Sequence, residues 1–335
     1  MVRSSERRTL PALALETECR SDQQIAADFL AYLQSDTSDH VAYEQELTRL
    51  IGGADARLYR YKLIGQEPRV LRVLRPAHRA EVLMVLQLVN QTLNQQGLHA
   101  PVIHRVCGDQ SVLGGVFAVM ELVPGQHLSA QPPEIHASVL GESMARMHTL
   151  DVRPFVETFR RAGIADEHFL FPALLQRIFD HVEQTMPWAV DLLGWLREQL
   201  PLDALDRSVI HGDYHGNNVM FEDGAITGVL DWAFAIADPA IDLANMMNVY
   251  FLFAPQLVED FSPRHAEQIV EGVLKAYQGI KSLDHQRIKA FRVNQLLGAL
   301  CMGPGAPEFM QKPESQRDYL SFIEQTTGIR VSLPA

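Results

Sequence analysis

One short segment of the chain carries several side chains of the types that do chemistry. In residues 211–218, which read His-Gly-Asp-Tyr-His-Gly-Asn-Asn, Asp213 is followed by Asn218, and an apolar strand begins at Val219. A Glu-Asp-Gly turn then leads into a second apolar run, which delivers Asp231 at its end. A tight turn returns the second strand along the first. We therefore expect the side chains of Asp213, Asn218 and Asp231 to lie together at the open end of this hairpin.

Side-chain oxygens converging in this way suit a hard cation. Magnesium uses few protein oxygens and keeps places for water and phosphate. Phosphoryl transfer needs such a metal, together with a carboxylate that orients an attacking hydroxyl and accepts its proton. Asn218 and Asp231 bracket the hairpin and can share the metal, whereas Asp213 lies on the loop and can face an acceptor hydroxyl.

Histidines near this segment have other expected roles. His211 stands at the entry of the loop, where a hydrogen bond could hold the turn. His215 either touches substrate or phosphate, or is a surface side chain of the loop. A zinc hydrolase would need further His or Cys ligands at recognisable spacing, and none stands out. His148 lies late in a predicted helix and is expected to serve interlobe or core packing.

The segment resembles the aminoglycoside phosphotransferase and choline kinase-like family, a branch of the protein-kinase-like fold. The resemblance rests on His-Gly-Asp, four residues, Asn, an apolar strand and Leu-Asp-Trp. It implies that Asp213 is the catalytic base, that Asn218 holds Mg²⁺, and that Asp231 bridges Mg²⁺ to the phosphates. ATP or GTP would be the phosphate donor.

The resemblance continues into the next run, Asp-Pro-Ala-Ile-Asp-Leu-Ala, which is similar to the family's Asp-Pro-x-x-Asp-Leu-Ala segment. Asp238 can cap a helix whose first residue is Pro239. Asp242 then lies about one turn into that helix and is expected to brace the metal loop. Both aspartates are therefore predicted to support the site rather than to react.

An earlier part of the chain resembles the family's nucleotide-binding lobe. Gly52 and Gly53 match its nucleotide-covering hairpin, where glycine lets backbone approach phosphate. The remaining residues that the resemblance assigns to the nucleotide are Arg72 for the phosphates, Glu81 as its acidic partner, and the backbone of Glu121 and Val123 for adenine.

Two features of this lobe stand out. Most kinases have Lys where this chain has Arg72, which is bulkier but can pair with both phosphate and Glu81. Arg69 and Arg75 flank it, and a register slip of one would change which residue points inward.

Residues 107–109 and 112–114, Cys-Gly-Asp and Val-Leu-Gly, resemble the subgroup related to phosphotransferase domains found with acyl-CoA dehydrogenases.

The surrounding patterns predict an α+β, protein-kinase-like, two-lobed protein. We expect a helical extension over 1–45, a β-rich nucleotide-binding lobe with its linker over 46–126, and a mainly helical lobe with the acceptor pocket over 127–335. Strands are predicted over 58–63, 70–74 and 116–120, and helices over 80–91, 135–150, 169–185, 188–200, 264–277 and 285–300.

Composition excludes several classes of protein. The 335 residues are 47% hydrophobic, a globular value, and no apolar run reaches the roughly 18 residues of a membrane span. No secretory or transit peptide is recognised, so a cytoplasmic location is expected. The net charge of −12 argues against nucleic-acid partners. A negative surface would suit a cationic small molecule, but in most proteins such a charge only keeps the protein soluble.

The sequence thus predicts a kinase that transfers the γ-phosphate of ATP or GTP to a hydroxyl of a small molecule, with Mg²⁺ as cofactor. The alternative is a catalytically idle, nucleotide-binding regulatory protein with a kinase-like fold. Antibiotic, choline, amino-acid-derived and sugar acceptors all remain open, because the fold and the motif do not choose among them. The oligomeric state also remains open.

Overall fold

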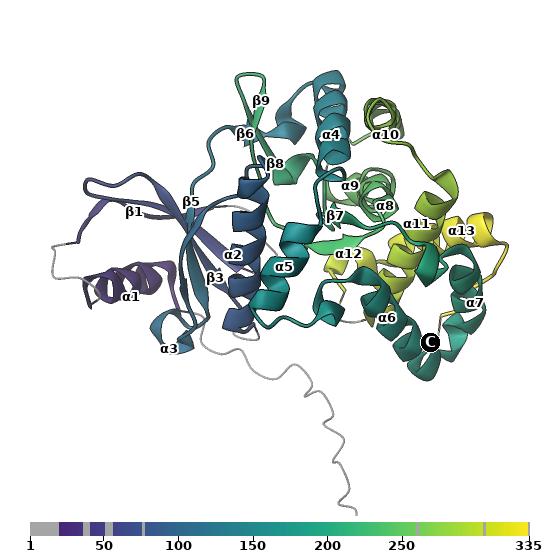
Figure 1. The fold of residues 1–335 in the computed structure, drawn as a ribbon, viewed down its shortest axis with the longest axis horizontal. Helices are drawn as coiled ribbons and strands as arrows, with labels where there is room; N and C mark the ends of the chain where they lie inside the picture. Colours follow the sequence, from purple (N-terminus) through teal and green to yellow (C-terminus); the bar gives the residue numbers. More distant parts are fainter. Residues whose placement is uncertain are drawn as a thin grey trace, which may run out of the picture. The chain divides into compact units, whose positions relative to one another are not determined.

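The structure, a computed structural model, describes residues 20–35, 41–50, 56–75, 78–258, 261–303 and 306–333 (Figure 1). Gly52 and Gly53, predicted to cover the nucleotide, lie outside the described residues. The chain divides into two compact units. The first comprises Met1–Met84 and Ile103–Leu122, and the second comprises Val85–Val102 and Val123–Ala335.

The first unit is built on one antiparallel sheet of five strands, in the order β1-β2-β3-β5-β4. Its strands are β1 (Tyr43–Leu50), β2 (Ala56–Leu63), β3 (Arg69–Leu74), β4 (Ile103–Cys107) and β5 (Phe117–Glu121). Its helices are α1 (Asp22–Ser35), α3 (Gln110–Leu113) and the start of α2 (Ala80–Gln95).

Helix α1 packs on one face of this sheet (Figure 1). Phe29 makes edge-to-face contacts with Tyr61 of β2 and Phe117 of β5, at ring-centroid distances of 5.2 and 5.9 Å. Leu71 and Val73 of β3 are buried in the same cluster. Since side chains alternate along a strand, Arg72 lies on the opposite face of β3 from α1.

The second unit is mainly helical. Its α-helices after α2 are α4 (Pro133–Met147), α5 (Arg153–Arg161), α6 (Phe171–Thr185), α7 (Val190–Gln199), α8 (Ala240–Asn248), α9 (Ala254–Leu257), α10 (Pro263–Gln278), α11 (His285–Cys301), α12 (Glu308–Gln311) and α13 (Pro313–Thr327). Short 3₁₀ turns are η1 (Leu128–Ala130), η2 (Asp166–His168), η3 (Pro187–Ala189), η4 (Leu202–Ala204) and η5 (Gly216–Asn218), and α8 continues as a π-helix, η6 (Val249–Phe253).

Helices α4 and α10 approach each other closely because glycines face the contact. A Cβ on Gly141 would lie 2.4 Å from the carbonyl oxygen of Val273, and one on Gly272 would lie 2.6 Å from the Cβ of Ala137. This packing brings the residue that follows α4, His148, beside Tyr277 near the end of α10.

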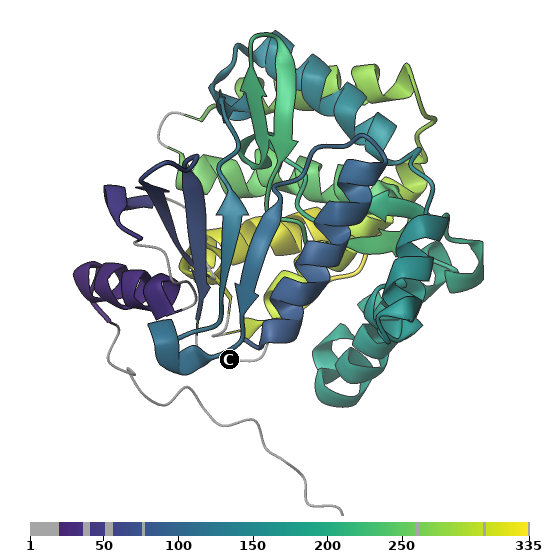
Figure 2. The ribbon, with the colours of Figure 1, turned by 60° about the vertical axis from the view of Figure 1, so that its left-hand side comes forward.

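Two small antiparallel sheets complete the second unit. In one, β7 (Ser208–Ile210) pairs with β10 (Ala235–Ala237); in the other, β8 (Val219–Glu222) lies between β6 (Gln126–His127) and β9 (Ala225–Val229). The β8–β9 hairpin lies next to α4 (Figure 2). Its turn has Asp223 at φ 50° and Gly224 at φ 83°, so the hairpin predicted from the Glu-Asp-Gly run is confirmed.

Most of the predicted elements appear within a few residues of their expected ends. The sequence did not predict several elements, among them β1, β4, α5 and the 15-residue helix α13. Strand β1 has no fully buried residue, and it lies at the sheet edge, so it lacks the apolar alternation by which strands are recognised. Among the described residues, no helix is both long and apolar enough to cross a bilayer.

Candidate active site

The candidate active site is formed by the loop that joins β7 to β8. The loop turns sharply at Gly212, whose φ is 87°. A Cβ there would lie 2.7 Å from the carbonyl oxygen of Ala233, so a larger residue would collide with the returning chain. On that returning chain, the Ala233 amide donates to the carbonyl of His211 at 3.0 Å. The loop is thereby fixed against the segment that carries Asp231.

Asp213 and Asn218 contact each other directly. The Asn218 amide nitrogen donates to the Asp213 carbonyl at 2.9 Å and to the Asp213 Oδ2 at 3.3 Å. Because the nitrogen serves as the donor, the amide oxygen is the atom of Asn218 that can face a cation. The Asp213 side chain is 51% exposed, so it is accessible to an acceptor molecule.

Asp231 is brought to the same place by the hairpin. Val219 pairs with Val229, and the Leu230 amide donates to the carbonyl of Asn218 at 2.8 Å, so Asp231 follows directly on that bond. Its φ of 54° lies in the left-handed region, which costs a non-glycine residue about 1–3 kcal/mol. The bonds of Leu230 and Ala233 on either side hold it there.

His211 uses both ring nitrogens inside the protein. Its Nε2 donates to the Leu230 carbonyl at 2.7 Å, and its Nδ1 accepts the Asp213 amide at 3.1 Å. The side chain is fully buried, and this burial lowers the pKa of His211. The imidazole is therefore neutral and ties the loop to the hairpin, which leaves no nitrogen for a metal ion.

Asp242 holds the start of the loop from behind. Its carboxylate accepts the backbone amide of His211 at 2.8 Å and that of Gly212 at 2.7 Å. It also contacts His148 Nε2 at 3.1 Å, and the other nitrogen of His148 bonds the Tyr277 hydroxyl at 2.8 Å. Asp242 has 0% exposure, so these bonds replace its lost hydration.

Asp238 supports the helix that carries Asp242. Its Oδ1 accepts the Ala240 amide at 3.0 Å, so it caps α8, which begins one residue after the predicted start at Pro239. Its Oδ2 accepts the Asp206 amide at 3.1 Å and the Arg287 guanidinium at 2.7 Å.

His215 lies against Asp213. Its Nδ1 lies 3.3 Å from the Asn217 amide, and its Nε2 lies 3.3 Å from Asp213 Oδ2. Partial burial raises the pKa of Asp213, but the hydrogen bond and charge of His215 outweigh it, and the net pKa lies below its usual value. Asp213 is therefore an ionised carboxylate at neutral pH, as a proton acceptor must be.

Two further residues, Tyr250 and Asn245, bond the backbone of the loop, and sequence reasoning missed both of them. The Tyr250 hydroxyl accepts the Gly216 amide at 3.2 Å and lies 2.7 Å from His136 Nε2. Asn245 donates to the Gly212 carbonyl at 2.6 Å. His148 was expected only to pack, whereas the structure gives it a bonded place between Asp242 and Tyr277.

The nucleotide residues predicted from the resemblance lie as follows. Arg72 on β3 is opposite Leu58 and Ala118, and Glu121 ends β5 opposite Arg69. Glu81 is in the first turn of α2, and Val123 is a buried residue of the second unit. Their roles toward a nucleotide stay predictions.

The donor set fits magnesium. The Asn218 amide oxygen and the Asp231 carboxylate would supply two hard oxygens and leave the other positions to water and phosphate, the pattern that Mg²⁺ prefers. Among the described residues, no three His, Cys, Asp or Glu side chains are grouped to hold a metal ion.

A family model described as "Phosphotransferase enzyme family" matches residues 46–288. The chain belongs to this family. Among curated relatives of this chain, acyl-CoA dehydrogenase family member 11 of Mus musculus is 28% identical over 157 residues, 43% of the chain and 20% of the relative. Homoserine kinase of Acidiphilium cryptum is 30% identical over 197 residues, 57% of the chain and 55% of the relative. The matches therefore span from a fifth to about half of these relatives.

This member of the family shares its fold with solved structures. A thermostable variant of the aminoglycoside phosphotransferase APH(4)-Ia, in a ternary complex with AMP-PNP and hygromycin B, matches with a TM-score of 0.60 and 15% identity. The match covers 91% of this chain and 99% of that one. Together with the five-stranded sheet and the helical second unit, this confirms the predicted α+β, kinase-like fold.

Proposed function

We propose that this phosphotransferase is a magnesium-dependent small-molecule kinase that transfers the γ-phosphate of ATP to a hydroxyl group. The observation that carries the proposal is the contact of Asp213 with Asn218, at the point where the hairpin returns Asp231. That arrangement combines an accessible ionised carboxylate with two oxygens suited to Mg²⁺. Family membership supports the same chemistry.

In the proposed reaction, the acceptor hydroxyl donates a hydrogen bond to the Asp213 carboxylate. Asn218 and His215 keep that carboxylate in one orientation by their contacts to Oδ2. As the acceptor oxygen forms its bond to the γ-phosphorus, the bond from phosphorus to the β-phosphate oxygen breaks and ADP leaves. The hydroxyl proton passes to Asp213 and then to solvent.

Asn218 and Asp231 would hold the Mg²⁺, which offsets phosphate charge when bound. The backbone bonds on either side of Asp231 keep its backbone in one place before any ligand arrives. The nucleotide roles of Arg72, Glu81, Glu121 and Val123 belong to the same proposal, as do those of Gly52 and Gly53 outside the described residues. GTP is the second candidate donor.

The acceptor is proposed only as a class. Hygromycin B is bound to one solved neighbour and another relative is a homoserine kinase, so the acceptors tested should range from aminoglycosides to small hydroxy acids. The net charge of −12 suits cationic acceptors such as aminoglycosides and choline.

The test is nucleotide consumption by the purified protein with and without Mg²⁺, across aminoglycosides, macrolides, choline, homoserine, sugars and hydroxyacyl compounds. Stimulation by one class should disappear in Asp213→Asn, which removes the base but keeps the shape of the side chain. Asp223→Asn, in the exposed turn of the same hairpin, is the matched control and should keep full activity. An Asp213→Asn variant with wild-type turnover would refute the mechanism.

One observation favours a second candidate, an idle nucleotide-binding protein. Arg72 stands where most kinases have Lys, and its forked guanidinium differs in shape from an ammonium. Nucleotide binding without transfer to any acceptor would support this reading. Transfer that is lost in Asp213→Asn would eliminate it.

A further inference from the structure

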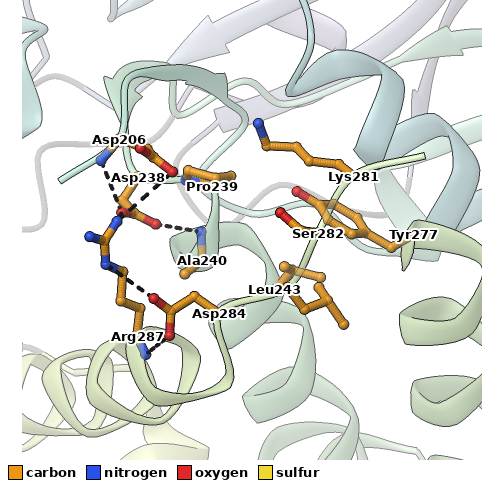
Figure 3. Close-up of a pocket in the computed structure, with 11 residues that line it drawn as sticks. Asp206, Asp238, Pro239, Ala240, Leu243, Tyr277, Lys281, Ser282, Asp284 and Arg287 are labelled. Carbon is orange, nitrogen blue, oxygen red and sulfur yellow. Dashed lines mark hydrogen bonds and ion pairs between the residues drawn. The ribbon is translucent and has the colours of Figure 1, made fainter. Parts of the chain in front are cut away.

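A cavity of about 260 Å³ lies in the second unit, apart from the residues proposed for phosphate transfer (Figure 3). It is lined by the start of α8, by Tyr277 near the end of α10, and by the connection from α10 to α11. Asp213, Asn218 and Asp231 are not among its lining residues. Its walls are largely polar, and they carry charges of both signs on opposite sides (Figure 3).

One wall is acidic. Arg287 contacts Asp238 at 2.7 Å and Asp284 at 3.4 Å, while Asp206 is 3.9 Å away. Three carboxylates therefore face a single guanidinium. Asp238 and Asp284 also accept backbone amides, whereas the Asp206 side chain is 68% exposed and lies beyond hydrogen-bond distance of Arg287. Asp206 can thus receive a cationic group from a ligand.

The opposite wall carries donors. Figure 3 shows the polar ends of Lys281 and Ser282 directed toward the acidic wall, whereas the hydroxyl of Tyr277 beside them is bonded to His148. Within the described parts of the chain, Lys281 has no carboxylate partner. A positive charge therefore faces the negative wall across the space.

This charge pattern selects a type of ligand. The ammonium of Lys281 would repel a simple cation, and the net negative charge of the other wall would repel a simple anion. A molecule with one charge of each sign satisfies both. The volume is below the roughly 300–1,000 Å³ of pockets for drug-sized ligands, so the molecule must be small. We propose that this cavity binds a free α-amino acid, with its carboxylate at Lys281 and Ser282 and its ammonium at Asp206.

The cavity is connected to the catalytic loop by a chain of hydrogen bonds. Tyr277 lines the cavity, and its hydroxyl bonds His148, which in turn bonds Asp242. Asp242 accepts the amides of His211 and Gly212. An amino acid packed beside Tyr277 is therefore expected to change how firmly the loop is held; only the effect of this coupling on turnover rests on the proposed function.

Binding can be tested on the full chain without nucleotide by calorimetry and thermal denaturation. The probes are glycine, L-alanine and L-valine, which have no hydroxyl to phosphorylate, with acetate and methylamine as half-ligands. We expect the amino acids to bind and the half-ligands not to bind at the same concentration. Lys281→Met and Asp206→Asn should each weaken binding by about tenfold or more, since each removes a charge-assisted contact.

Lys275→Met is the matched control, because Lys275 is exposed on α10 and does not line the cavity. It should bind like the wild type. Absence of amino-acid binding at millimolar concentration, equal binding of the half-ligands, or wild-type affinity in Lys281→Met would overturn the proposal. The last result would place the amino acid at another site, such as that of the acceptor.

The coupling is tested by hydrogen–deuterium exchange of residues 208–216. Saturating L-alanine should change the exchange of the His211 and Gly212 amides in the wild type. Tyr277→Phe, which removes the hydroxyl that bonds His148, should still bind L-alanine but lose this response. Unchanged exchange in the wild type at saturation would overturn the coupling. Neither readout uses turnover, so they stand or fall separately from the kinase proposal.

Discussion

Replacing Asp242 by Asn tests whether one buried carboxylate holds the catalytic loop. The side chain has 0% exposure and accepts the amides of His211 and Gly212 while contacting His148. An amide keeps the shape, but it offers one acceptor oxygen where the carboxylate offers two. Its NH₂ group would face one of the backbone donors, which then loses its partner.

The magnitude follows from these three contacts. A buried donor left without a partner costs about 1–3 kcal/mol, and the remaining bonds lose the strength that comes from charge. We expect a loss of about 3 kcal/mol in the free energy of unfolding, toward the lower end of the range for breaking a buried ion pair. For a unit of this size that corresponds to a decrease of about 6–12 °C in Tm.

The assay is urea and thermal denaturation of wild type and Asp242→Asn, followed by turnover well below the lower Tm. Turnover should decrease as well, because the loop that carries Asp213 loses its anchor. Asp180→Asn, at a carboxylate that is 49% exposed, should change stability by less than about 0.5 kcal/mol. An Asp242→Asn variant as stable and as active as the control would refute the reasoning.

Three further predictions concern the same loop. Gly216→Ala places a Cβ 2.3 Å from His136 Nε2, so the loop or the histidine must move. We expect the free energy of unfolding to decrease by about 1–3 kcal/mol and kcat to fall. Unchanged values of both would contradict the close approach. Burial lowers the pKa of His136 to about 4, so below about pH 6.5 the unfolded chain binds a proton that the folded chain does not. The free energy of unfolding should therefore decrease by about 3 kcal/mol between about pH 6.5 and 4. A His136→Asn variant should show a flatter pH dependence of stability. His215→Ala removes the hydrogen bond and charge that lower the pKa of Asp213, so the acidic limb of the kcat profile should move to higher pH; a shift to lower pH would show that His215 acts otherwise.

The reactive part of the candidate site could be predicted because its order is local. Asp213 and Asn218 lie on one loop, and the turn at Asp223 and Gly224 returns the chain to Asp231. Turn residues and apolar alternation are short-range signals, so they are visible in the sequence. The family resemblance came from the same short run, and the family match confirms it.

The first unit shows the limit of such signals. A helical extension was predicted over residues 1–45, but nothing in that part of the sequence indicated which face of the sheet α1 covers. Strand β1 was missed because it is an edge strand without a buried face. Which face of β3 carries Arg72 was settled by its pairing register with β2 and β5.

The sequence by itself determined the fold class, the hairpin and the set of polar residues that the hairpin gathers, since each depends on neighbours along the chain. Only the tertiary structure decided what holds them. His148 is 94 residues from Asp242 and 129 from Tyr277, and the close packing of α4 on α10 brings His148 and Tyr277 together. Such contacts depend on how helices pack, and helix packing follows from the shape of whole surfaces rather than from any local pattern.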